Sequence, residues 1–268
     1  MAADRFDGAV FDVDGVLVDS PHERAWRETL DELMRTRWSP IRPATTWAPG
    51  ALTAELYQRA VSGKPRLDGA RAALDLFGVP DAAARAVEYA DLKQARVAGL
   101  IERGEFTAYP DALRFVAALR AAGVRLAAAS SSKNADAMLA RVDVEPGLTL
   151  LDCLDADVSG GDVARGKPDP EIFLAAAGEL GVPPARCFVV EDAIAGIQAA
   201  RAGGMAALGV ARHGEEELLA AAGADMVVTT LDDVPACGSR PRRSPRGRPA
   251  RSSPTRSAGA ARDAGPTA

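Results

Sequence analysis

The sequence predicts an α/β protein with a Rossmann-like, doubly wound parallel sheet and a small α-helical cap domain inserted after the first strand. Three observations predict it. Short apolar runs alternate with stretches of helical periodicity along most of the 268 residues, an order typical of parallel sheets covered by helices. Several of these runs are apolar throughout, as strands are when both faces of a sheet are covered. One long stretch near the N-terminus has helical patterns and no confident strand pattern, which indicates an insertion.

The predicted strands are short apolar runs, five of them clear and one weaker. The clear runs are residues 8–14, 124–131, 187–192, 206–210 and 225–230, and the weaker one is 153–159. Between them lie stretches with apolar residues at i, i+3 and i+4 that end in or near glycine, as amphipathic helices do. These predicted helices are residues 110–123, 168–181, 192–204 and 215–224.

The inserted stretch is too long for a loop. Its helical patterns are residues 22–36, 51–61, 67–78 and 82–104. We expect residues 1–20 and 108–235 to form the core domain and residues 21–107 to form the cap. Two connections to the core would make the cap a hinged lid over the end of the first strand.

Residues 236–268 form a basic tail rich in Arg, Pro, Ser and Ala. From Arg240 onward it has eight arginines and one acid, whereas the whole chain has a net charge of −5. The tail cannot bury enough apolar surface to offset ordering, so we expect it to be disordered. No aromatic residues interleave the arginines to stack on bases, which argues against nucleic acid as a partner. An extension without a role, or the product of a frameshift, would have the same composition.

Composition and the N-terminus indicate a cytoplasmic protein. No segment approaches the ~20 uninterrupted apolar residues that a membrane span needs, and the first residues lack a signal-peptide pattern. The three cysteines have no metal-type spacing and suit reduced thiols. We therefore expect no membrane partner, and we expect a monomer.

Charged and hydroxyl side chains stand where predicted strands end, the edge at which open parallel sheets bind ligands. They are Asp12, Asp14, Ser130, Lys167, Glu191 and Asp192. Residues i and i+2 of a strand point the same way, so Asp12 and Asp14 can face one small volume. Carboxylates so close need a proton or a cation between them, and Mg²⁺ prefers such oxygen ligands. A cation beside a carboxylate nucleophile, with Lys167 nearby, suits a transferring phosphoryl group.

One apparent nucleotide-binding motif is excluded. Residues 161–167 (GDVARGK) fit the pattern of a P-loop, but the next residue is Pro168. A P-loop needs a Ser or Thr hydroxyl at that position, and proline offers neither a hydroxyl nor an N–H.

Four segments, in order, resemble the motifs of the haloacid dehalogenase superfamily: FDVDGVLVDS, SSSKN, GKPDPEIF and VVEDAIAGIQAARAGG. The resemblance covers about residues 6–234. HERAW, Arg66, Lys93 and ASSSKN are similar to the β-phosphoglucomutase branch. The resemblance implies a Mg²⁺-dependent enzyme that interconverts β-D-glucose 1-phosphate and glucose 6-phosphate through an aspartyl phosphate and a sugar bisphosphate.

The resemblance also implies roles for single residues. Asp12 would be the nucleophile and Asp14 the general acid/base, and both would hold Mg²⁺ with Glu191 and Asp192, Asp14 through its carbonyl. Ser130 and Lys167 would complete the catalytic set by binding the transferring phosphate. Further substrate contacts would come from His22, Trp26, Arg66, Lys93, Ser131, Ser132, Lys133 and Asn134. Of these, Arg66, Ser132, Lys133 and Asn134 would hold a second phosphate, and His22 would lie at the hinge. The resemblance also implies a cis peptide bond between Lys167 and Pro168.

Two alternatives stay open. A phosphatase of the same superfamily, hydrolysing a sugar phosphate or another small phosphomonoester, needs one phosphate site only; Arg66 and residues 132–134 favour the mutase. A non-catalytic binding protein would use the basic tail, and its binding would be salt-sensitive and lost without residues 236–268. The set of Asp12, Asp14, Lys167 and Asp192 argues against that alternative.

Overall fold

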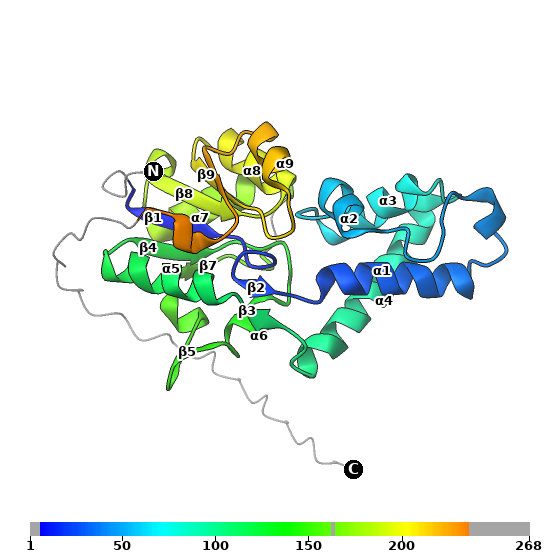
Figure 1. The fold of residues 1–268 in the computed structure, drawn as a ribbon, viewed down its shortest axis with the longest axis horizontal. Coiled ribbons are helices and arrows are strands. Elements are labelled where there is room, and N and C mark those ends of the chain that lie inside the picture. The colour runs from blue at the N-terminus through cyan, green and yellow to red at the C-terminus, as the bar shows by residue number, and fades with distance from the viewer. Residues whose placement is uncertain (1–5, 162–163, 236–268) are drawn as a thin grey trace, which may run out of the picture.

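The computed structural model describes residues 6–161 and 164–235, and it confirms the α/β architecture. Figure 1 shows a core of sheet and helices at one end of the elongated molecule and a group of helices, within residues 22–102, at the other. The basic tail expected to be disordered, residues 236–268, lies outside the described residues. Among the described residues, no helix is both long and apolar enough to cross a membrane.

Six strands within the described residues form one parallel sheet, and all six correspond to predicted strands. In spatial order they are β10 (Met226–Val228), β9 (Ala206–Val210), β8 (Cys187–Glu191), β1 (Gly8–Phe11), β4 (Arg125–Ala128) and β7 (Ala156–Asp157). The strand β1 ends at Phe11, earlier than the predicted Asp14. It ends there because Leu17 and Val18 both donate backbone hydrogen bonds to the carbonyl of Val13 and turn the chain.

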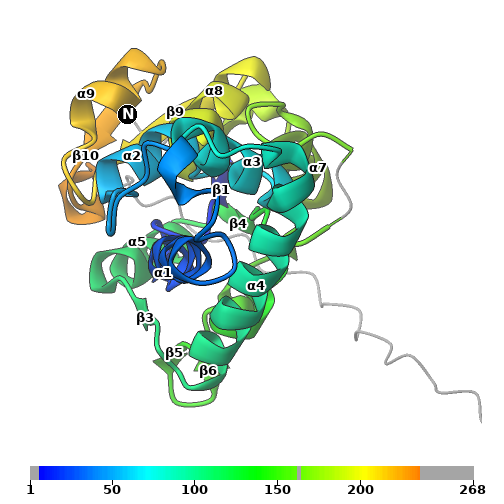
Figure 2. The ribbon, with the colours of Figure 1, turned by 90° about the vertical axis from the view of Figure 1, so that its right-hand side faces the viewer.

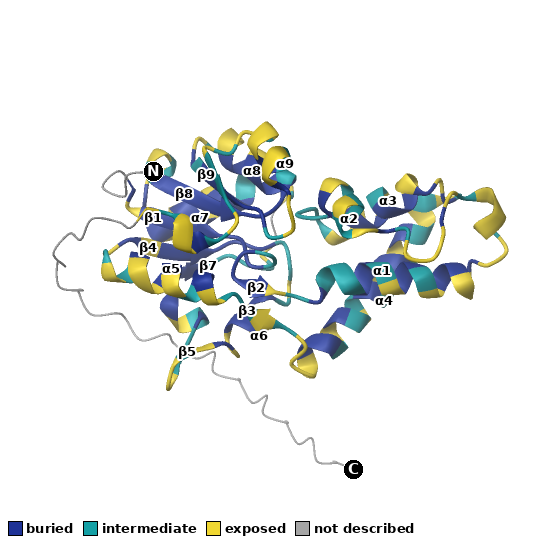
Figure 3. Cartoon of the chain, in the orientation of Figure 1, coloured by how far each residue is buried: buried dark blue, intermediate teal, exposed yellow. Residues whose placement is uncertain are grey.

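Helices cover both faces of the sheet, which explains why the strands are apolar throughout. The helices α5 (Pro110–Ala121) and α6 (Ala135–Leu139) belong to one apolar cluster, and α7 (Glu171–Leu180), α8 (Ile194–Ala202) and α9 (Glu216–Ala221) to the other. Side chains of β1 alternate between the two clusters: Phe11 packs with Phe115 of α5, and Val10 belongs to the cluster of Phe173 from α7. Figure 3 shows these strands buried beneath helices whose outer faces are exposed.

The inserted helices form a third apolar cluster of their own. They are α1 (His22–Arg35), α2 (Ala54–Ala60), α3 (Arg66–Leu76) and α4 (Ala82–Glu102). Figure 2 shows α1 end-on with α4 beside it, and between them the hydroxyl of Tyr89 donates to the carbonyl of Trp26 at 2.7 Å. The name cap is kept below for this group of helices and the loops between them. The division of the chain into core and cap domains stays a prediction.

The structure also has short elements that the sequence patterns did not predict. The chain enters and leaves the cap through an antiparallel pair, β2 (Val18–Asp19) and β3 (Thr107–Ala108), and a second pair is β5 (Asp143–Glu145) with β6 (Leu148–Thr149). Strands of two or three residues are too short to show a period. The same holds for the 3₁₀ turns, which are Arg42–Ala44, Leu151–Cys153, Pro184–Arg186 and Leu231–Asp233. The short helix α6, which begins at Ala135, is also absent from the helices predicted by apolar spacing.

Candidate active site

The register of three neighbouring strands brings the predicted site residues to one edge of the sheet. Phe11 of β1 lies opposite Val190 of β8 on one side and Ala128 of β4 on the other. Because the strands are parallel, the residues that follow them lie at the same edge of the sheet. Asp12 donates its backbone N–H to Val190, and Ser130 and Glu191 therefore lie on either side of the segment that carries Asp12 and Asp14.

Lys167 links two of these strand ends. Its Nζ lies 2.6 Å from Oδ1 of Asp12 and 2.7 Å from Oε1 of Glu191, in a fully buried position over the ring of Phe173. Burial disfavours the charge on Lys167, but the two carboxylates outweigh it and raise the pKa of the lysine. The peptide bond between Lys167 and Pro168 is cis, as expected.

Three buried carboxylates form a cluster that fits a divalent metal ion. Oxygen atoms of Asp12, Glu191 and Asp192 lie within 4.8 Å of one another. Burial and the neighbouring carboxylates raise the pKa of Asp192 well above its usual value, and burial raises the pKa of Asp12 to about 7. Three buried carboxylates against the single ammonium of Lys167 leave negative charge for a cation to balance. Oxygen ligands of this kind are those that Mg²⁺ prefers.

Main-chain atoms approach this acidic cluster closely. Gly15 has a φ of +83°, and a Cβ at that position would lie 2.1 Å from Oδ2 of Asp192. The same carboxylate oxygen accepts a hydrogen bond from Nε2 of Gln58, on α2 of the cap, at 3.4 Å. The cap thus contributes a polar group to the acidic cluster.

Asp14 faces a different set of partners from Asp12. Its Oδ2 accepts a hydrogen bond from the hydroxyl of Ser130 at 3.4 Å. Its Oδ1 lies 3.9 Å from Nε2 of His22 and, among the described residues, has no hydrogen-bond partner although it is buried. The same His22 nitrogen lies 3.3 Å from the hydroxyl of Ser132. Asp14 therefore has a free acceptor where a substrate hydroxyl could donate.

His22 and Lys93 form a buried pair beside Asp14. The Nζ of Lys93 lies 2.7 Å from Nδ1 of His22 and 4.6 Å from the centroid of the Trp26 ring. Burial lowers the pKa of Lys93 to about 7, although the charge of Asp14 opposes this. Burial, together with Lys93, lowers the pKa of His22 to about 4. Each group thus titrates below its ordinary range.

A cavity of about 740 Å³ lies between the cap and this edge of the sheet. It brings together twelve of the predicted site residues: Asp12, Asp14, His22, Trp26, Arg66, Lys93, Ser130, Ser131, Ser132, Lys133, Lys167 and Asp192. Glu191 and Asn134 do not line it. Glu191 accepts from Lys167 and from the backbone N–H of Ala193, and Asn134 accepts from Gln94 of α4 at 3.0 Å.

The cavity also has lining residues that the sequence reasoning missed. They include Tyr57, Lys64, Pro65, Asp68, Gln94 and Arg165. Lys64 lies two residues before Arg66, and Arg165 lies two residues before Lys167. This closeness to predicted site residues is the sequence feature that could have identified them. Tyr57 and Gln94 lie on cap helices without any motif, and only the packing of the cap against the core brings them to the site.

The cap is seated directly on the core. A Cβ added at Gly166, in the core loop before Lys167, would lie 2.0 Å from Cγ of Pro65, and one added at Gly63 would lie 3.2 Å from Cβ of Ala193. Arg66 follows this contact at the start of α3, where its side chain is half-exposed and lies 3.6 Å from Asp91.

The chain is an α/β protein with a parallel sheet, a cap, and a site made of carboxylates and a lysine. This combination suits the chemistry of phosphoryl groups. A family model described as haloacid dehalogenase-like hydrolase matches residues 6–204. The chain belongs to this family, whose phosphoryl-transfer enzymes share this fold.

The chain is similar to β-phosphoglucomutases and to CbbY. A β-phosphoglucomutase from Mycobacterium bovis is 32% identical over 240 residues, which cover 84% of this chain and 90% of that protein. A solved structure of β-phosphoglucomutase from the hyperthermophilic archaeon Pyrococcus sp. strain ST 04 has 29% identity and a TM-score of 0.64, covering 85% of this chain and 94% of that one. CbbY from Rhodobacter sphaeroides, solved in complex with phosphate, has 26% identity and a TM-score of 0.61, with coverages of 85% and 96%.

Proposed function

We propose that this protein is a sugar phosphomutase of the β-phosphoglucomutase type, which interconverts β-D-glucose 1-phosphate and glucose 6-phosphate. One observation carries the proposal: Arg66 of the cap lines the same cavity as Lys167 of the core. A mutase must hold the two phosphates of a sugar bisphosphate at once, whereas a phosphatase needs one phosphate site. The volume of the cavity lies within the range of small-molecule sites.

The first step in this proposal is attack by a carboxylate oxygen of Asp12 on the phosphorus of the bound phosphate. The bond from phosphorus to the sugar oxygen breaks, and an aspartyl phosphate forms. Lys167, hydrogen-bonded to Asp12, opposes the effect of burial on the pKa of this carboxylate and attracts the phosphate oxygens. Mg²⁺ held by Asp12, the carbonyl of Asp14, Glu191 and Asp192 would supply further positive charge to the transferring group.

Asp14 handles the proton of the sugar oxygen. Its buried Oδ1, which has no hydrogen-bond partner in the described part of the chain, suits a proton donor to the departing oxygen and an acceptor in the reverse step. Ser130 donates to the other oxygen of Asp14 and orients the carboxylate. His22, in contact with Ser132 and Lys93, lies where α1 of the cap begins, so it connects Asp14 to the cap.

The second phosphate is assigned to Arg66 with Ser132 and Lys133, which line the cavity. Asn134, also expected at this phosphate, does not line the cavity and bonds to Gln94. The aspartyl phosphate next transfers its phosphoryl group to the free hydroxyl of a bound sugar monophosphate, whose proton passes to Asp14. The bisphosphate formed in this way turns round and presents its other phosphate to Asp12. The contact of Pro65 with Gly166 supports this cycle because a seated cap excludes water from the aspartyl phosphate.

The test is a product assay with the full chain, Mg²⁺, β-D-glucose 1-phosphate and a trace of glucose 1,6-bisphosphate. Glucose 6-phosphate is the expected product, with little inorganic phosphate. If inorganic phosphate and free glucose are released instead, the mutase proposal is wrong and the protein is a phosphatase of the same family.

A further inference from the structure

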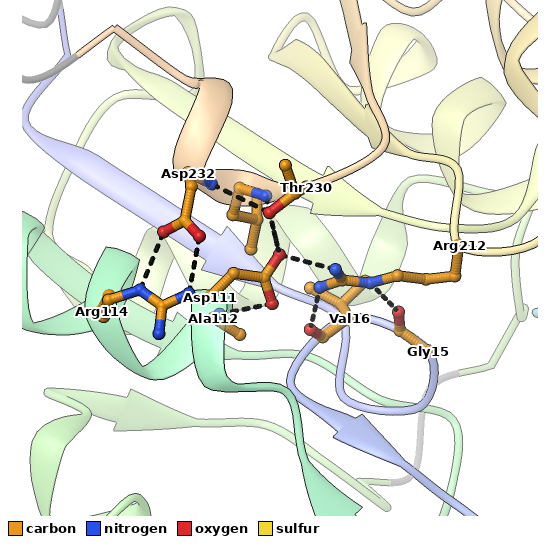
Figure 4. Close-up of polar contacts among 9 residues, drawn as sticks. Gly15, Val16, Asp111, Ala112, Arg114, Arg212, Thr230 and Asp232 are labelled. Carbon is orange, nitrogen blue, oxygen red and sulfur yellow. Dashed lines mark hydrogen bonds and ion pairs between the residues drawn. The ribbon is translucent and has the colours of Figure 1, made fainter.

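Arg212 connects a distant part of the core to the loop that follows Asp14. It lies two residues beyond β9, and its side chain reaches back across the carboxyl edge of the sheet. Its Nε donates to the carbonyl of Gly15 at 3.3 Å and its Nη2 donates to the carbonyl of Val16 at 3.2 Å. Figure 4 shows both bonds arising from one side of the guanidinium.

The guanidinium is fixed on its remaining side by Asp111 of α5. Its Nη1 lies 2.6 Å from Oδ2 of Asp111, and both side chains are less than 10% exposed, at 9% and 8%. The same oxygen accepts from the hydroxyl of Thr230 at 3.0 Å and the backbone N–H of Leu231 at 2.8 Å. Arg212 also lies over the ring of Tyr109, 4.0 Å from its centroid. A planar fork held at this many points has little freedom.

The loop that Arg212 holds is in direct contact with the acidic cluster. The Cα of Gly15 packs so closely on Asp192 that a Cβ would lie 2.1 Å from the carboxylate oxygen. Gly15 is also the residue that follows Asp14, and its N–H donates to Val18 at 2.9 Å. A shift of the Gly15 and Val16 carbonyls therefore moves both the direction of Asp14 and the surface against which Asp192 rests.

We propose that Arg212 is a positioning residue: by binding the Gly15 and Val16 carbonyls while anchored on Asp111, it fixes the loop after Asp14 against Asp192. The inference deepens the proposed function, because it rests on phosphoryl transfer at Asp12 and Asp14. It does not depend on whether the enzyme isomerises or hydrolyses its substrate, since both reactions use these two carboxylates.

The neighbouring pair of Arg114 and Asp232 provides a matched control. Figure 4 shows this pair beside the Arg212 contacts. Arg114 is bonded to Asp232 through Nε at 2.9 Å and Nη2 at 2.6 Å. The pair also joins α5 to the turn Leu231–Asp233, but its side chains are 60% and 46% exposed and neither bonds to Gly15 or Val16. Arg114→Gln thus removes an ion pair of α5, the helix that also carries Asp111, and leaves the loop contacts in place.

The experiment compares the full-length wild type with Arg212→Gln, Arg212→Lys and Arg114→Gln by hydrogen–deuterium exchange without substrate. Peptides covering residues 12–18 report on the loop, and peptides from β4 and β8 report on the sheet. We expect exchange in the loop to rise at least tenfold in both Arg212 variants while the sheet peptides keep the wild-type rate, because local opening is cheaper than global unfolding. Arg114→Gln should match the wild type in both.

Turnover of p-nitrophenyl phosphate then shows whether the loop matters for chemistry. Loss of loop position should lower kcat by about 10- to 100-fold and change KM less than about threefold, since a small misplacement of reacting groups costs this much. Arg212→Lys keeps a positive charge beside Asp111 but cannot bond both carbonyls in a fixed plane, so it should fold as the wild type does and still lose kcat.

Three results would overturn the inference. Wild-type loop exchange in Arg212→Gln would show that the loop holds its position unaided. A wild-type kcat in Arg212→Lys would show that the charge suffices, and equally faster exchange in loop and sheet peptides would show a general stabilising role. Failure of the mutase proposal looks different: the wild type would release phosphate without isomerising, and the effect of Arg212 on exchange and kcat would persist.

Discussion

The ammonium of Lys93 and the imidazole of His22 meet at 2.7 Å in the interior, one from α4 and the other from the first residue of α1. Trp26 covers the ammonium from the side. No carboxylate among the described residues forms an ion pair with Lys93 in this structure, and burial lowers its pKa from 10.5 to about 7. A bound phosphate would supply the missing negative charge.

This pairing predicts a pH-dependent cost to stability. Between pH 7 and pH 10.5 the unfolded chain holds the Lys93 proton and the folded chain has lost it, so the wild type gains stability as pH rises. Lys93→Met lacks this gain. The free energy of unfolding of Lys93→Met should exceed that of the wild type most below pH 7. This difference should shrink by about 1.4 kcal/mol per pH unit above pH 7. Urea unfolding at pH 6 and pH 9 measures it.

The control is Lys133→Met, because the ammonium of Lys133 is exposed to water. It should change the free energy of unfolding by the same amount at both pH values. A constant difference for Lys93→Met as well would contradict the burial argument.

The acidic cluster predicts stabilisation by magnesium. Ligands that bind only the folded state raise its stability, so adding Mg²⁺ should raise the Tm of the wild type in a thermal melt. Asp192→Asn should lose this increase and should be more stable than the wild type without metal by about 1 kcal/mol, since it removes a crowded buried carboxylate.

Asp157→Asn is a suitable comparison for the magnesium experiment. Asp157 ends β7 at the same edge of the sheet but is not part of the cluster. Its variant should keep the wild-type response to Mg²⁺. A full response in Asp192→Asn would place the metal elsewhere.

The assignment of Asp12 as nucleophile predicts that Asp12→Asn forms no aspartyl phosphate. Turnover should fall by about 10⁴-fold or more, because an amide does not attack phosphorus. Mass spectrometry of acid-quenched enzyme detects the phosphorylated peptide. Asp19→Asn, in the same segment but exposed, should retain both activity and the phosphopeptide; a phosphopeptide in Asp12→Asn would remove the role from Asp12.

The second phosphate site predicts unequal losses in Arg66→Ala. Isomerisation should fall about 10- to 100-fold, since a hydrogen bond to a charged group is worth about 1.5 to 3 kcal/mol. Hydrolysis of p-nitrophenyl phosphate, which has no second phosphate, should change less than about threefold by the same reasoning. Arg71→Ala is the control, because Arg71 lies on the same helix and does not line the cavity. Equal losses in both reactions would argue against a second phosphate site.

The sheet and the residues at its edge were predictable because both depend on local patterns. Each strand is predicted by its apolar run. Because neighbouring strands are parallel and in register, Asp12, Ser130 and Glu191 must lie at one edge of the sheet. The strand ends were harder to place. The end of β1 depends on a turn at Val13 that only the three-dimensional structure shows.

Contacts between residues far apart in the sequence could not be predicted from local patterns. Gln58 bonds to Asp192 across 134 residues, and Arg212 bonds to Gly15 across 197. Neither residue belongs to a motif, and an arginine after a strand is commonly solvated. Their partners are fixed by how the cap sits and how α5 packs, which are properties of the whole fold.

The contact between Gly166 and Pro65 has a consequence for the fate of the proposed aspartyl phosphate, which either a sugar hydroxyl or water can attack. Any side chain at residue 166 would act as a wedge, since even a methyl group would overlap the proline ring. Such a side chain would keep the cap from closing on the core, so that bulk water could reach the proposed aspartyl phosphate. A single substitution beside Lys167, at a residue that takes no part in the chemistry, would then turn the proposed mutase into a hydrolase.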